Sequence, residues 1–247
     1  MEEWQILEWK RWAPLPEFHK SKETYETIIS QILNNQHFSF LRMGDGDMKV
    51  YLNMEGVSVP IEYKKIFKSV MEPIFTINNP KLIIGVENNT ACSDIMLTQN
   101  CAMYKDTVEQ FYAMLSADAL AINCVTFMHM YVETGLTDFF KSLKHRNVIL
   151  VGSSFLKNIK IECASIKYVT TKPWGSWEDQ AGLETQVDTL INMTVDPVIL
   201  YACSISGKML LSKMFFKYSN ITQIDIGSAF DPYAGIVSRP WHKNELT

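Results

Sequence analysis

The chain has 247 residues, a net charge of −4 and 47% hydrophobic residues. This length suits one sizeable domain, and the composition predicts a packed core and excludes a disordered chain. The acidic balance excludes a surface for nucleic acid polymers, but it leaves room for a small anionic ligand held by local cations and amides.

Cysteine usage indicates a reducing compartment. The five cysteines are an odd number and form no C-x-x-C pair, which favours free thiols over disulfides or a zinc site. The N-terminus lacks a basic-then-apolar leader, and no apolar run reaches the roughly 18 residues of a transmembrane helix. We therefore expect a cytoplasmic protein without a transmembrane segment.

Residues 1–35 are predicted to form a helical N-terminal extension. Trp4, Trp9 and Trp12 lie before two prolines that end any first helix. These tryptophans can pack on the body of the protein, on a second subunit of a homo-oligomer, or on a membrane surface. Residues 21–35 then repeat apolar side chains at helical spacing.

The rest of the chain predicts an α/β fold that is Rossmann-like, with a mostly parallel sheet and helices on both faces. Continuous apolar runs alternate with helical stretches, and no linker divides residues 1–247, so we expect a single domain. In such sheets ligands bind at the carboxyl ends of the strands. The expected strands are 38–42, 82–86, 119–124, 148–151, 166–169, 198–202 and 223–226, and the expected helices are 62–77, 104–116, 136–144, 177–193 and 207–218.

Two acids follow the first of these strands. Asp45 and Asp47 point the same way if their segment is extended, so that their carboxylates can share one Mn²⁺ or Mg²⁺ ion. Gly44 and Gly46 let the backbone turn sharply and approach a ligand closely. Arg42 can face a phosphate with its planar guanidinium. These residues predict a metal-assisted site for a departing diphosphate, and an ordinary polar turn is the alternative.

The sequence of residues 40–48 is FLRMGDGDM, which resembles the R-[FY]-G-D-G-E motif of the GT-D glycosyltransferases, formerly a domain family of unknown function. In that family a D-x-E motif is associated with the metal and the sugar nucleotide. The resemblance implies that Asp45 and Asp47 are the metal ligands and take part in catalysis. Asp47 stands in place of the family's Glu, and Met43 in place of its aromatic residue.

Residues 173–179, PWGSWED, follow a predicted strand and open a predicted helix. Trp174 and Trp177 can stack on a base or a sugar ring, or can lie in the core. Glu178 is a candidate catalytic base for an acceptor hydroxyl, or it only complements the helix dipole. A similar aromatic and acidic segment occurs in the GT-D family.

A strand, a turn of small residues and a helix follow in the segment that ends at Lys208. Amides and hydroxyls of Ser204, Ser206 and Gly207 can bind phosphate at the helix N-terminus, and Lys208 can add positive charge. Plain packing of helix on strand is the alternative. The segment resembles the strand, G-x-x-[GA]-K and helix of the GT-D family.

The last predicted strand carries a further candidate, Asp225, which can accept hydrogen bonds from ribose or sugar hydroxyls. Its D-I-G sequence resembles the terminal D-[IL]-G strand of the GT-D family, although Ser228 stands where many relatives have His. Asp231, Arg239 and His242 lie in the tail beyond, where they can close over the site.

These motifs occur in the order of the GT-D family between residues 38 and 242. The resemblance implies a metal-dependent glycosyltransferase that moves a sugar from a nucleotide-sugar donor, by default UDP-linked, to a glycan or other hydroxyl acceptor, as in polysaccharide biosynthesis. Two alternatives stay open. One is a haloacid-dehalogenase-like phosphatase, which also places D-x-D after a strand. The other is a non-catalytic nucleotide-sugar-binding protein.

Overall fold

The computed structural model describes residues 16–55, 58–86, 110, 113–115, 120–124, 126–173, 175–239 and 242. Some predictions fall on residues outside these ranges. They concern Trp4, Trp9, Trp12, Trp174 and most of the helix expected at 104–116. Within them, no helix is both long enough and apolar enough to cross a membrane.

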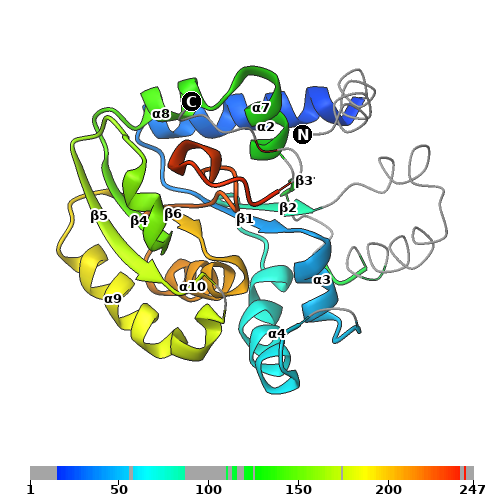
Figure 1. The fold of residues 1–247 in the computed structure, drawn as a ribbon. Coiled ribbons are helices and arrows are strands. Elements are labelled where there is room, and N and C mark those ends of the chain that lie inside the picture. Colours follow the sequence, from blue (N-terminus) through cyan, green and yellow to red (C-terminus); the bar gives the residue numbers. More distant parts are fainter. Residues whose placement is uncertain are drawn as a thin grey trace.

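A seven-stranded sheet of order β3-β2-β1-β7-β6-β4-β5 lies at the centre of the described fold (Figure 1). Each pair of neighbouring strands runs parallel, which confirms the predicted α/β fold. The strands are β1 Ser39–Met43, β2 Leu82–Val86, β3 Leu120–Asn123, β4 Asn147–Ser153, β5 Ser165–Thr171, β6 Pro197–Ala202 and β7 Thr222–Asp225.

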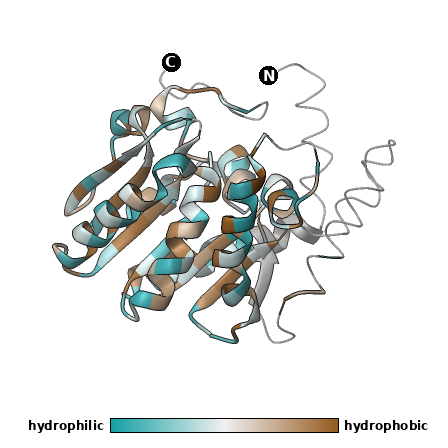
Figure 2. Ribbon diagram, turned by 90° about the horizontal axis from the view of Figure 1, so that it is seen from below, coloured by the Kyte–Doolittle hydropathy of each residue, from teal (hydrophilic) through white to brown (hydrophobic). Residues whose placement is uncertain are grey.

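Helices cover both faces of this sheet, as predicted. In Figure 1, α4, α9 and α10 lie on one side of the sheet, and α2, α7 and α8 lie on the other. Figure 2 looks onto the first layer, where hydrophilic and hydrophobic stretches alternate around the helices. The helices are α2 Pro16–Leu33, α3 Asp45–Tyr51, α4 Ile61–Thr76, α7 Thr126–Thr134, α8 Thr137–Ser142, α9 Gln180–Asn192 and α10 Ser204–Lys217, with short 3-10 helices η1 Ser154–Asn158, η2 Ser176–Asp179 and η3 Pro232–Ala234.

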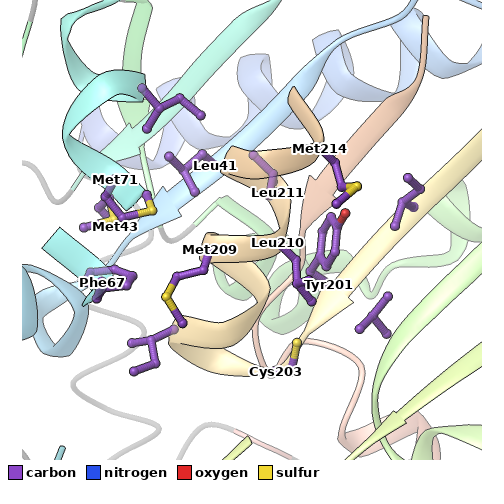
Figure 3. Close-up of a cluster of buried hydrophobic side chains, with 14 of the residues drawn as sticks. Leu41, Met43, Phe67, Met71, Tyr201, Cys203, Met209, Leu210, Leu211 and Met214 are labelled. Atoms are coloured by element: carbon purple, nitrogen blue, oxygen red, sulfur yellow. The ribbon is translucent and has the colours of Figure 1, made fainter. Parts of the chain in front are cut away.

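Successive residues of each central strand enter two different cores. Leu41 and Tyr201 pack with the layer of α4, α9 and α10, whereas their neighbours Phe40 and Leu200 pack with α2, α7 and α8. This is the two-residue period of a strand. Because both faces are covered, the strands appear in the sequence as unbroken apolar runs. Figure 3 shows the first core, where leucine and methionine side chains surround Tyr201.

The helix expected at 21–35 is confirmed as α2, and it is part of the second core. Tyr25, Ile28 and Ile32 are buried on one side of it. α2 begins at Pro16, before the predicted start, at a position where the missing N–H of proline costs nothing. The Tyr25 hydroxyl accepts a hydrogen bond from the Phe139 N–H at 3.2 Å, which joins α2 to α8.

Arg146 joins separate segments at the edge of the sheet opposite the strand carboxyl ends. Its side chain is 6% exposed. It donates to the Ile32 carbonyl at 3.0 Å and to the Asp196 carboxylate at 2.9 Å. A third hydrogen bond goes to the side chain of Asn35. Arg146 therefore holds the end of α2 against the chain that enters β6.

We predict that Arg146→Met lowers the free energy of unfolding by about 2 kcal/mol, because it leaves a buried carbonyl and a carboxylate without their donor. Urea unfolding followed by circular dichroism measures this. Lys141→Met is the control, since the Lys141–Asp138 pair is 71% and 72% exposed and such a pair contributes about 0.5 kcal/mol or less. Equal losses for the two variants would contradict the assigned role.

Candidate active site

The segment expected to be an extended turn is the beginning of a helix. Gly44 is the N-cap of α3, whose first residue is Asp45. The Asp47 carboxylate accepts a hydrogen bond from the Gly44 N–H at 3.0 Å, as the third residue of a helix does in a capping box. Residues two apart in a helix do not face each other, so the extended geometry predicted for Asp45 and Asp47 is wrong. The side chain of Asp45 lies outside the described part of the structure.

Neither glycine of this segment adopts a conformation that requires glycine. Gly44 has φ −78° and ψ 175°, and Gly46 lies in α3 without a positive φ. The sharp glycine turn expected here is therefore wrong. A Cβ atom on Gly46 would meet no atom of the described residues within 4 Å.

Four charged side chains meet at the carboxyl ends of β1, β7 and β6. The Lys208 Nζ atom lies 3.1 Å from Asp47 Oδ2 and 2.9 Å from Asp225 Oδ2. The Arg42 Nε atom lies 4.0 Å from the same Asp225 oxygen. We call Arg42, Asp47, Lys208 and Asp225 the charge quartet. Two carboxylates and two cations cancel, so its formal charge is zero.

The quartet is largely shielded from water. The Lys208 and Asp225 side chains are 2% and 3% exposed, and those of Asp47 and Arg42 are 14% and 18% exposed. Burial raises the pKa of Asp47, and the nearby Lys208 opposes this rise. Burial alone would lower the pKa of Lys208, but Asp225 and Asp47 outweigh it and raise that pKa above its ordinary value. Lys208 is therefore a protonated cation at neutral pH.

Gly227, which the sequence analysis did not select, supports Arg42. Its φ of +57° is in the left-handed region that favours glycine. A Cβ atom there would lie 2.6 Å from Arg42 Nη2, so the guanidinium rests directly on the backbone of Gly227. The Gly227 N–H also donates to Asp225 Oδ1 at 3.0 Å. The D-I-G sequence thus fixes an acid and a cation of the quartet together.

The beginning of α10 combines packing with backbone strain. Ser204 is exposed and has φ 53°, the one positive φ among the described residues other than Gly, Asn and Asp. The buried Ser206 hydroxyl lies 2.9 Å from the Ser176 hydroxyl of η2. A Cβ atom on Gly207 would lie 3.1 Å from Tyr201 Cβ, so this glycine lets α10 pack closely on β6. Phosphate binding by Ser204, Ser206 and Gly207 stays a prediction.

The tryptophan-rich segment lies beside α10, and its residues have different surroundings. The Trp177 ring is partly buried, with its centroid 6.3 Å from that of Tyr63 on α4. Glu178 is exposed and its carboxylate pairs with Lys172 at 3.2 Å. None of the described contacts joins Glu178 to the charge quartet, so its role as a catalytic base stays a prediction.

The tail beyond β7 forms a cluster of its own. The buried Asp231 carboxylate accepts a hydrogen bond from the Ser238 hydroxyl, and burial raises its pKa. The Ser238 N–H donates to His242 Nδ1 at 3.1 Å, and the His242 ring packs edge-on against Tyr131 of α7. Arg239 is exposed. Closure of Asp231, Arg239 and His242 over the site stays a prediction.

Metal coordination by Asp45 and Asp47 also stays a prediction. In the part of the chain that the structure describes, no three His, Cys, Asp or Glu side chains are grouped to hold a metal ion. Asp47 is the described member of the predicted pair, and it is also bound by Lys208.

The fold and the quartet together define an open, parallel α/β protein with a charged site at the carboxyl ends of its central strands, where such sheets bind ligands. The particular fold is that of the GT-D glycosyltransferases, as the sequence motifs predicted. A new glycosyltransferase of the domain of unknown function 1792, from Streptococcus sanguinis, aligns with a TM-score of 0.64 and 12% identity, covering 85% of this chain and 81% of that chain.

Two further structures of the domain of unknown function 1792 align over 88% of this chain and 84% of theirs, each at 16% identity. One is a selenomethionine-substituted structure with a TM-score of 0.64, and the other, at 0.62, is described as a distinct glycosyltransferase fold. At these identities the likeness shows a shared fold. No family model and no curated protein matches the sequence.

We predict that Gly227→Ala lowers the free energy of unfolding by about 3 kcal/mol, because alanine is strained at positive φ and its Cβ displaces the Arg42 guanidinium. Gly135→Ala is the control: φ is +73°, and the nearest atom to its Cβ would be the Tyr233 hydroxyl at 3.4 Å. The control should lose only the roughly 1 kcal/mol of backbone strain. Urea unfolding of both variants measures the difference, and equal losses would refute the contact with Arg42.

The burial of His242 in the tail predicts that the stability of the protein depends on pH. Burial lowers the pKa of His242 from 6.5 to about 4, so the folded chain prefers the neutral ring. The associated stability is complete above pH 6.5 and falls as the pH drops towards 4, by about 2 kcal/mol between pH 7.5 and pH 5. His242→Asn should flatten this slope in urea unfolding at the two pH values. His145→Asn, at an exposed position, should leave the slope unchanged, and an unchanged slope in His242→Asn would contradict the prediction.

Proposed function

We propose that this protein is a glycosyltransferase that moves a sugar from a nucleotide-sugar donor, by default UDP-linked, to a hydroxyl of a glycan or another acceptor. A shared fold does not fix a function, so the proposal depends on the site. The observation that carries it is the charge quartet at the carboxyl ends of β1, β7 and β6, in a fold shared with a glycosyltransferase.

The chemistry that such a transfer needs is stabilisation of the leaving diphosphate, which gains negative charge as the sugar departs. Arg42 is the most exposed member of the quartet, and its planar guanidinium matches phosphate oxygens. Gly227 and Asp225 fix its position, so its orientation is set before a ligand binds. The first turn of α10, whose N–H groups have no acceptor within the helix, follows β6 at the same edge of the sheet and adds positive potential.

The residues present fit a divalent metal if a third acid takes part. The quartet alone is neutral and has no excess charge for Mn²⁺ or Mg²⁺. Asp45, two residues from Asp47, would give the site an excess of one negative charge, and carboxylate oxygens suit both ions. We therefore propose Asp47 as the described metal ligand and Asp45 as the acid that supplies the excess negative charge; the metal would supply Lewis-acid stabilisation of the diphosphate.

Acceptor binding and proton removal are assigned to residues outside the charge quartet. Trp177 and Glu178 follow β5 and lie next to α10, on the same carboxyl edge as the quartet. We assign Glu178 as the base that takes the proton of the acceptor hydroxyl. Trp174, Ser204, Ser206, Lys208, Asp231 and Arg239 complete the proposed binding surface.

Two other functions make different predictions. A haloacid-dehalogenase-like phosphatase would use Asp45 as a nucleophile and cleave a simple phosphate monoester such as p-nitrophenyl phosphate. A non-catalytic nucleotide-sugar-binding protein would bind the donor without turnover. The GT-D fold favours the transferase over the phosphatase, and turnover of the donor separates the transferase from the binding protein.

A thermal-shift panel of nucleoside diphosphates and their sugars, with and without Mn²⁺, tests the proposal first. A ligand that binds the folded state raises the melting temperature, so the donor should raise it more than the other compounds of the panel. Release of nucleoside diphosphate from the selected sugar nucleotide then measures turnover. We expect Asp47→Asn to reduce that rate about a hundredfold or more.

Asp138→Asn is the matched control, because Asp138 is an exposed acid on α8 that pairs only with Lys141 among the described residues, and its rate should equal that of the parent protein. Stabilisation without release of the nucleotide would identify a binding protein instead. Cleavage of p-nitrophenyl phosphate would identify a phosphatase. An absence of stabilisation by any sugar nucleotide would refute the proposed function.

A further inference from the structure

We propose that the Lys208 ammonium competes with the divalent cation for Asp47, so that the metal binds tightly only together with an anionic diphosphate. The inference deepens the proposed function, on which it rests for the identity of the anion and for the metal ligands. It assigns to Lys208 control over the coupling between metal binding and diphosphate binding, in addition to any contact with phosphate.

The geometry places an ammonium where a shared cation would be expected. Lys208 Nζ is within 3.1 Å of one oxygen of Asp47 and 2.9 Å of one oxygen of Asp225. The same Asp47 oxygen also accepts the Gly44 N–H. A divalent ion that approaches Asp47 therefore meets a carboxylate whose Oδ2 atom is already bound by two donors.

The ammonium cannot easily give way to the metal. Lys208 lies in the second turn of α10, and its side chain is 2% exposed. Removing it from the two acids would leave buried charges without partners, which is strongly unfavourable. Its charge is poorly screened by salt because the site excludes water, so a second cation beside it is repelled.

A diphosphate changes this balance. Its negative charges offset Arg42 and Lys208, which removes the repulsion that a divalent ion meets in the free protein. The acids and the phosphate oxygens can then share the metal. Binding of the metal and of the diphosphate should therefore be mutually favourable, and by linkage each should strengthen the other by the same factor.

Mn²⁺ titrations read by electron paramagnetic resonance, which reports the free ion, test this with the full chain. For the parent protein we expect UDP or inorganic pyrophosphate to strengthen Mn²⁺ binding by about tenfold or more. In Lys208→Met the competing cation is gone, so Mn²⁺ alone should bind at least about tenfold more tightly than to the parent protein. Lys213→Met is the control: Lys213 is on the same helix and pairs with Glu184 away from the quartet, so its Mn²⁺ affinity should be unchanged.

Lys208→Met leaves two buried carboxylates facing each other, and this variant can fail to fold. The double variant Lys208→Met with Asp225→Asn removes one cation and one acid together, so that the remaining charges of Arg42 and Asp47 still cancel. It should also bind Mn²⁺ more tightly than the parent protein, because Asp47 no longer has the ammonium as a partner. Circular dichroism identifies which variants are folded.

The inference is overturned if the folded variants bind Mn²⁺ no more tightly than the parent protein, or if the parent protein binds Mn²⁺ equally well with and without the diphosphate. Failure of the proposed function has a different signature. In that case no sugar nucleotide is bound or turned over, whereas the comparison of Mn²⁺ affinity between the parent protein and the Lys208 variants still decides the role of Lys208.

Discussion

The structure depends on one buried interaction, the Lys208 ammonium between the carboxylates of Asp47 and Asp225. Each of these groups would be costly to bury alone, and together they satisfy one another. The three residues belong to α3, α10 and β7, and α3 is far from the other two elements in the sequence. Their contact fixes how the segment after β1, the segment after β6 and the end of β7 meet. This contact also determines the position of Arg42 and therefore of the proposed diphosphate site.

A second polar network supports the first from inside the core. The Tyr201 hydroxyl donates to the Gln223 side chain at 2.9 Å, and the Gln223 amide donates to the Ser39 hydroxyl at 3.1 Å. These residues lie on β6, β7 and β1, the same three strands whose ends carry the quartet. Buried polar groups that satisfy one another favour a single arrangement of the elements that carry them. The central strands are therefore fixed both along their length and at their carboxyl ends, while the surrounding helices supply mainly apolar contacts.

Most of the fold could be predicted from the sequence because the strands are buried on both faces and appear as apolar runs. Two helices could not. α7 has apolar residues such as Phe127 and Met130 without a clear stripe, and α3 begins in a Gly-Asp-Gly-Asp segment that is typical of a turn. What makes α3 a helix is partly tertiary, since Asp47 both caps it and pairs with Lys208. The candidate residues Arg42, Asp47, Lys208 and Asp225 were predicted individually. Their contact, and the support from Gly227, depend on residues up to about 180 positions apart, which local patterns do not reveal.

The strained backbone of Ser204 has a consequence for how the chain can be altered. Glycine adopts a φ of 53° without a steric penalty, so a glycine at this exposed position would have less backbone strain. The chain has a hydroxyl-bearing residue there instead, at a conformational cost of about 1 kcal/mol. A substitution of Ser204 by glycine would therefore relieve the backbone strain, and it would remove an exposed hydroxyl at the beginning of α10.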